Sequence, residues 1–174
     1  MNLSLVRFAG GSGSLGRWGT MWLTGASSAV IKTTHYEDIE VPGEVAEDRP
    51  GGIVLLNEAM GRLLFLPYEG GIIAGFDLAS GEELFRPVTL PRDENRGLRI
   101  PDYRILDGGG LIYLTECSLM RFGEDLLLIW RVGEDFGRWE IDGVSYREIV
   151  LVSVDERGRW EHQTWSLDDG RMIE

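Results

Sequence analysis

Turns that contain glycine recur along the whole chain, and they constrain its fold more than any other feature. Glycine supplies 24 of the 174 residues, about twice its average share of roughly 7%. Many of these glycines lie in short polar clusters with aspartate or glutamate, which is typical of hairpin turns that need a positive φ. The clearest clusters are residues 69–71, 106–110, 141–143 and 155–158. Such frequent turns favour short strands over long helices.

The segments between these turns are short and rich in aliphatic, β-branched and aromatic residues, as strands are. They are residues 28–34, 52–57, 63–68, 71–78, 83–88, 102–106, 111–116, 125–132, 138–141, 147–154 and 160–167. We therefore predict an all-β fold, either an antiparallel sandwich, a barrel or propeller-like sheets, with short hairpins and little or no helix. The length suits a single all-β domain over 1–174. Irregular loops are expected near 39–52 and 91–101, because each holds two prolines and several charges.

Residue alternation predicts which side of two strands faces the core. In WEHQTWSL (160–167), Trp160, His162 and Thr164 share one face, and Glu161, Gln163 and Trp165 share the other. In DLLLIWRV (125–132) both faces are apolar. We therefore expect that strand to be central in its sheet and covered on both sides.

Two segments share one sequence scheme. FDLASGEELF (76–85) and WSLDDGRMIE (165–174) each place an aromatic residue first, leucine third and glycine sixth. Their leucines, Leu78 and Leu167, are separated by about twice the roughly 40–45 residue period of a propeller blade. FDLASGEEL resembles the strand–turn–strand signature that closes blades in propellers with quinoprotein-type or WD-type repeats. The resemblance covers ten residues per copy and implies at most about four blades. Two ordinary hairpins with glycine turns are the alternative.

The charge of the chain excludes several classes of partner. Acidic residues number 29 against 17 basic ones, which gives a formal net charge of −12, and Lys32 is the only lysine. Nucleic acids and anionic membranes both attract clustered Lys and Arg, and the arginines here are spread singly. We expect no nucleic-acid or membrane partner. An acidic surface favours a basic protein partner, which its field would attract.

The lone cysteine and the apolar runs indicate the cellular compartment of the protein. Cys117 has no second cysteine to pair with, and its apolar surroundings predict a small buried side chain rather than a nucleophile. The N-terminal apolar stretch is short and interrupted by Arg7, unlike a secretory signal. No apolar run approaches the roughly 20 residues that cross a bilayer. These features predict a cytoplasmic protein in a reducing compartment.

One glycine motif is typical of nucleotide binding. Residues 11–16 read GSGSLG after a strand-like run, which fits G-x-G-x-x-G and resembles the dinucleotide-binding fingerprint of short-chain dehydrogenases. Glu37 or Asp38 lies where that resemblance implies a ribose-binding acid. The following residues carry two glycines and no amphipathic stripe, and no alternating βαβ pattern follows. We therefore favour a Gly-Ser loop between two strands over a phosphate-binding turn.

Other catalytic and metal signatures are weak. His35 and His162 are the only histidines, far apart in sequence, so a site with two histidines and a carboxylate would depend entirely on the fold. There is no G-x-S-x-G nucleophile motif. Glu116 lies among apolar residues, and burial would raise its pKa. The abundant carboxylates do not single out a catalytic pair. We predict no catalytic residue, no metal and no cofactor.

The candidate binding residues are acids and tryptophans. The densest acidic cluster is Glu37, Asp38, Glu40, Glu44, Glu47 and Asp48. Trp18, Trp22 and Trp139 lie among glycines, polar residues and acids, where a partly exposed aromatic ring can anchor a partner or stack on a sugar.

We therefore expect an acidic protein-binding module, in its most specific form an immunity-type antagonist of a basic protein. The alternatives are a β domain that binds a small ligand or carbohydrate, an enzyme that uses the GSGSLG loop or a carboxylate pair, and a subunit that assembles through sheet edges. The sequence leaves the oligomeric state open.

Overall fold

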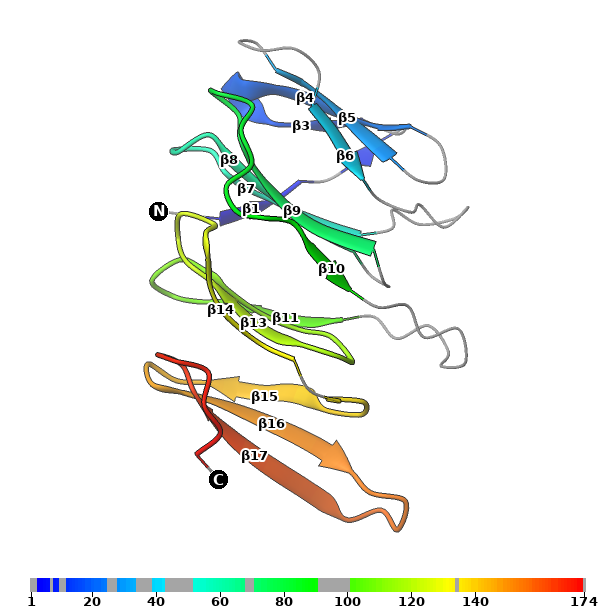
Figure 1. The fold of residues 1–174 in the computed structure, drawn as a ribbon, viewed down its shortest axis with the longest axis vertical. Coiled ribbons are helices and arrows are strands. Elements are labelled where there is room, and N and C mark those ends of the chain that lie inside the picture. Colours follow the sequence, from blue (N-terminus) through cyan, green and yellow to red (C-terminus); the bar gives the residue numbers. More distant parts are fainter. Residues whose placement is uncertain are drawn as a thin grey trace. The chain divides into compact units, whose positions relative to one another are not determined.

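The described part of the chain consists of antiparallel sheets and contains no α-helix (Figure 1). The computed structural model describes residues 3–6, 8–9, 12–24, 28–33, 39–42, 52–67, 71–90, 101–133 and 135–173. The all-β prediction is confirmed, and none of the described sheets closes into a barrel. None of the described residues belongs to a helix that is long and apolar enough to cross a membrane.

The chain divides into two compact units: Met1–Arg99 with Glu124–Leu127, and Ile100–Gly123 with Leu128–Glu174. The expectation of a single domain over the whole chain stays a prediction.

The first unit holds two sheets in which most strands follow chain order. One sheet has the order β1–β7–β8–β9–β10, formed by Leu3–Leu5, Gly52–Asn57, Arg62–Pro67, Gly71–Asp77 and Val88–Leu90. The other has the order β2–β3–β4–β5–β6, formed by Phe8–Ala9, Ser12–Ser14, Gly19–Thr24, Ser28–Thr33 and Ile39–Pro42, with the 3₁₀ turn η1 at Gly16–Trp18. Leu15, Met21 and Ile31 from the second sheet and its turn share a core cluster with Leu56, Leu63 and Phe65 of the first sheet. Apolar burial between the two sheets therefore stabilises this unit.

The second unit also pairs two sheets. The four-stranded sheet has the order β11–β12–β13–β14, formed by Asp102–Ile105, Leu111–Leu114, Leu119–Phe122 and Leu128–Val132. The three-stranded sheet has the order β15–β16–β17, formed by Glu140–Val144, Glu148–Val154 and Trp160–Ser166. One core cluster joins Ile112 and Leu119 of the first sheet to Ile149, Leu151 and Trp165 of the second. The side of β15–β17 that carries Trp165 is therefore the buried side.

Nearly all of the predicted strand segments contain a strand, and two expectations are wrong. DLLLIWRV is not a central strand: β14 is the last strand of its sheet, its residues alternate between half-buried and exposed, and Ile129 is 49% exposed. The apolar run extends into the preceding turn, where Leu126 is fully buried at a φ of 61°. The predicted irregular stretch 39–52 begins with β6, which pairs with β5. Its residues 43–51, and residues 91–100 of the other predicted loop, lie outside the described part.

The two copies of the sequence scheme form the same turn. In the first, Gly81 N–H donates to Asp77 O (2.7 Å) and Asp77 N–H donates to Glu82 O (2.9 Å). In the second, Gly170 N–H donates to Ser166 O (3.0 Å) and Ser166 N–H donates to Arg171 O (2.8 Å). Both glycines have a positive φ, which explains why glycine occupies the sixth position of the scheme. The leucines of both copies, Leu78 and Leu167, are buried.

Two tryptophans pack on glycine turns in the same manner, one in each unit. Trp130 donates its indole N–H to Leu167 O (2.9 Å), and a Cβ on Gly170 would lie 2.7 Å from its ring. Trp18 donates its indole N–H to Glu58 O (2.7 Å), and a Cβ on Gly61 would overlap its ring. In both cases the indole N–H donates to a carbonyl of the turn, and the ring packs against a glycine, which has no side chain in the way.

Candidate functional site

The predicted acidic cluster is mostly outside the described residues. Glu37, Asp38, Glu44, Glu47 and Asp48 all lie there, so their candidacy stays a prediction. The backbone of Glu40 lies in β6, opposite Val30 of β5. The structure therefore neither assembles nor disperses this cluster.

The three candidate tryptophans have different environments. Trp18 is half-buried, and its indole is engaged with the Glu58 carbonyl and with the Arg17 guanidinium, 5.0 Å from the ring centre. Trp139 is half-buried against the core of the second unit. Trp22 is 45% exposed, and its indole N–H donates to the Thr20 hydroxyl (3.2 Å). Of the three, Trp22 alone presents a largely exposed ring.

The GSGSLG segment lacks the geometry of a dinucleotide site in its described residues. Ser12–Ser14 form β3 and pair with β4, and Leu15 is fully buried. A single 3₁₀ turn separates this strand from β4, so no helix N-terminus follows the motif. Pyrophosphate binding at this motif depends on the N–H groups of such a helix.

We therefore expect NAD⁺ and NADP⁺ to leave the melting temperature of the protein unchanged. A ligand at 100 times its Kd would stabilise the protein by roughly 2.7 kcal/mol, which differential scanning fluorimetry detects easily. A rise in melting temperature that saturates with cofactor would contradict this interpretation of the segment.

The described residues contain a more complete candidate surface, the solvent-facing side of β15–β17, which we name the outer face. Along β16, Ile149, Leu151 and Ser153 are buried, whereas Glu148 and Val154 at the ends of the opposite side are exposed. Directly opposed residues of paired strands point to the same side of a sheet. The register therefore assigns the side chains of the outer face, apart from Asp142, where the pairing of β15 with β16 shifts. Figure 1 shows the three strands side by side in chain order.

Three rows of opposed residues make up the centre of the outer face. One row is Glu140, Val152 and His162, the next is Gly143, Val150 and Thr164, and the third is Val154 and Trp160. The valines form an apolar stripe along β16 that ends beside Trp160. This ring is 67% exposed, more than any other tryptophan among the described residues.

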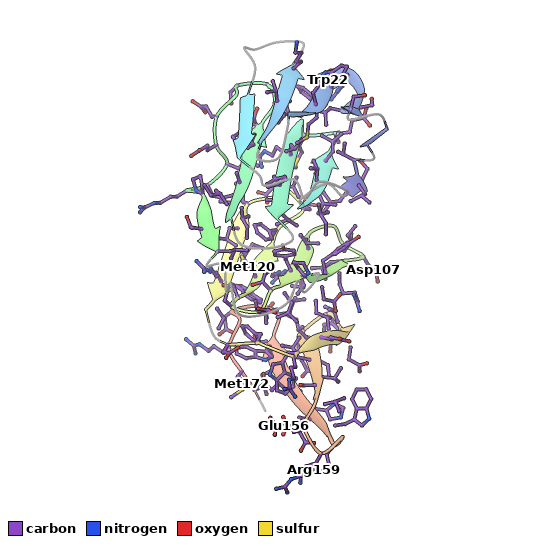
Figure 2. The ribbon with its side chains drawn as sticks, turned by 90° about the vertical axis from the view of Figure 1, so that its right-hand side faces the viewer. Trp22, Asp107, Met120, Glu156, Arg159 and Met172 are labelled. Carbon is purple, nitrogen blue, oxygen red and sulfur yellow. The ribbon has the colours of Figure 1, made fainter. Side chains whose placement is uncertain are left out.

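A tight hairpin positions Trp160 at the end of this stripe. Asp155 Oδ1 accepts the backbone N–H groups of Arg157 and Arg159 (2.8 Å each), and Asp155 Oδ2 accepts a side-chain N–H of Arg159. The pKa of Asp155 is lowered, chiefly because its carboxylate accepts the backbone N–H of Arg159. The Arg159 side chain and the backbone N–H of Arg157 lower the pKa further, and desolvation opposes them. Gly158, at a φ of 76°, completes the turn. Figure 2 shows Glu156 and Arg159 projecting from the tip of this hairpin.

The charges of the three strands are all negative. Glu140, Asp142, Glu148 and Glu161 are exposed, and β15, β16 and β17 contain no lysine or arginine. Of the arginines in the adjoining turns, Arg159 pairs with Asp155 (2.7 Å) and Arg147 lies over the Tyr146 ring, whereas Arg157 is exposed at the tip of the β16–β17 hairpin. An apolar stripe with an acidic surround is suited to a partner that presents apolar and basic side chains.

The sequence carried a signal for this surface. The alternation in WEHQTWSL correctly placed Trp160, His162 and Thr164 on one side and Trp165 on the other, and Trp165 is 2% exposed. REIVLVSV alternates less clearly, because valines occupy most of its outward-facing positions. Only the register with β17 shows that these valines and Trp160 form one surface.

Comparison with known protein families and with curated proteins finds no match to this chain. Among the described residues, no group of three His, Cys, Asp or Glu side chains could hold a metal ion. His35 lies outside those residues.

Proposed function

We propose that this protein is a protein-binding module that docks a basic partner on the outer face of β15–β17. The observation that carries the proposal is the exposed Trp160 at the end of a valine stripe, on strands whose only charges are acidic. Aromatic rings surrounded by less critical contacts are the usual energetic centres of protein interfaces. The acids around them steer a basic partner toward the surface.

The most specific form of the proposal is an antagonist of the immunity type, which neutralises a basic protein by covering its functional surface. The net charge of −12 supports this form, because charge complementarity accelerates association. The lone cysteine supports a cytoplasmic location.

We expect Trp160→Ala to weaken partner binding by about 30-fold or more, which corresponds to the 2 kcal/mol or more of an interface hot spot. The immobilised chain would be used to capture proteins from cells of its own source, with mass spectrometry to identify them and calorimetry on the purified partner. Higher salt should slow association, since the surrounding charges act at long range.

Trp22→Ala is the matched control, because Trp22 is also an exposed tryptophan but lies in the first unit. It should leave binding unchanged. Two results would overturn the proposal: a partner without an excess of basic residues, or a partner whose affinity falls with Trp22→Ala and not with Trp160→Ala.

A further inference from the structure

The free edge of β17 is covered along only part of its length within the described residues. After Ser166 the chain turns back along this strand: Ser166 N–H donates to Arg171 O (2.8 Å), and Ile173 N–H donates to Thr164 O (2.7 Å). Figure 1 shows the chain turning back at this end of β17. The main-chain groups of Ser166 and the carbonyl of Thr164 are therefore satisfied by the turn and the returning segment.

The same edge continues past the returning segment to His162 and Trp160. Successive residues of an antiparallel strand direct their main-chain groups to alternate sides, and the register of β16 with β17 is regular over all seven pairs. His162 and Trp160 therefore direct their N–H and C=O groups to the same edge as Thr164. No described main-chain group pairs with them on that edge.

The opposite edge of the sheet, formed by β15, is covered by side chains at Ile141. The N–H of Ile141 in β15 donates to Asp102 Oδ2 (2.8 Å), and Arg104 Nη2 donates to the Ile141 carbonyl (2.7 Å). Two side chains of β11 thus satisfy the main-chain groups that an added strand would need. No such pair of side chains covers His162 or Trp160 among the described residues.

We infer that an extended, basic segment of the partner adds to this open edge as a further β-strand beside residues 160–163. The inference rests on the proposed function, which supplies the basic partner. The edge lacks three of the features that block strand addition, since β17 has no proline, no lysine and no bulge. Main-chain hydrogen bonds supply the affinity in such strand addition, and alternate side chains supply the specificity.

The side chains of β17 define the chemistry of the added segment. Glu161 is exposed on one side of the strand, and an opposed lysine or arginine would form a cross-strand ion pair. Trp160 and His162 lie on the other side, where an apolar residue would contact the indole and extend the valine stripe. The segment therefore alternates basic and apolar residues.

The probe is an eight-residue peptide that alternates lysine with valine, and its control is the same peptide N-methylated at alternate residues. Methylation removes main-chain donors without changing side-chain charge. We expect about tenfold or greater loss of affinity for the methylated peptide, because several main-chain hydrogen bonds cannot form. On binding of the unmodified peptide, hydrogen exchange measured by NMR should slow about tenfold or more at the His162 and Trp160 amides.

Two pairs of variants separate main-chain from charge effects. His162→Pro removes one donor at the open edge, where proline is tolerated, and should weaken peptide binding up to about tenfold, whereas His162→Ala keeps that donor and should weaken binding clearly less. Glu161→Gln should weaken binding about two- to fivefold through loss of a cross-strand ion pair. Glu156→Gln makes the same charge change at the exposed hairpin tip and should have no effect. If His162→Pro does not fold, as judged by circular dichroism, amide exchange decides the question alone.

Absence of peptide binding, equal affinity for the methylated peptide, or unchanged exchange at His162 and Trp160 would each overturn strand addition. Capture of a basic partner that depends on Trp160 would leave the proposed function standing in all three cases. Conversely, the peptide could add as a strand while no partner depends on Trp160. That result would refute the proposed function and leave the strand-accepting edge standing.

Discussion

Trp165→Ala should destabilise the second unit by about 3–5 kcal/mol, the range for truncating a large aromatic side chain in a core. Trp165 is 2% exposed, and its ring centre lies 5.5 Å from that of Phe136. It packs in the cluster that joins the two sheets of this unit. Its removal would leave a cavity between the sheets that the neighbouring strands cannot fill.

Trp160→Ala is the matched control for this prediction, because it makes the same chemical change five residues earlier in the same strand. Trp160 is 67% exposed, so its truncation should alter the free energy of unfolding by no more than about 0.5 kcal/mol. Urea denaturation followed by far-ultraviolet circular dichroism measures the free energy of unfolding of both variants. Similar losses for the two variants would show that the sides of β17 are assigned incorrectly. The stability of Trp160→Ala also qualifies it for the binding experiments.

Gly170→Ala should destabilise the second unit by about 2–5 kcal/mol, through two additive effects. Gly170 has a φ of 68°, a conformation that costs an L-residue roughly 1–2 kcal/mol. The new methyl group would also lie 2.7 Å from the Trp130 ring, and overpacking of this kind costs about 1–3 kcal/mol. The ring cannot retreat freely, because its indole N–H donates to Leu167 O.

Two other glycines of the same unit separate these effects. Gly158 also has a positive φ, 76°, but a Cβ there would have no atom within 4 Å, so Gly158→Ala should show only the backbone cost of roughly 1–2 kcal/mol. Gly108 has open space and no positive φ in the range that disfavours side chains, so Gly108→Ala should be close to neutral. With Trp130→Ala in the background, Gly170→Ala should cost no more than Gly158→Ala. Equal effects of all three single substitutions would refute the role of the ring.

The fold class could be predicted because its signals are local. Strand segments such as 52–57 and 160–167 were identified from short runs between glycine turns, and the structure places β7 and β17 there. The segments 76–85 and 165–174, which share one sequence scheme, likewise form two turns with the same hydrogen bonds. In each case the deciding interactions lie within a few residues of one another, so a short window of sequence contains them.

The candidate site was predicted only in part. Alternation along one strand separates Trp160 from Trp165, but it does not show which strand lies alongside or where an edge remains open. Trp18 has polar and glycine neighbours in sequence, yet its indole is engaged by a carbonyl 40 residues away. Trp160 was not among the candidate tryptophans. Sequence neighbours thus indicated exposure less reliably than strand register did.

By itself the sequence determined the period of the strands, the position of the turns and the acidic charge, since each depends on residue type and short spacing. The tertiary structure alone decided which strands are central and which edges are closed. DLLLIWRV became an edge strand because no strand pairs with its far side among the described residues. The edge at Ile141 is closed by Asp102, 39 residues away. Such coverage comes from distant segments, and apolar composition does not encode which segment will provide it.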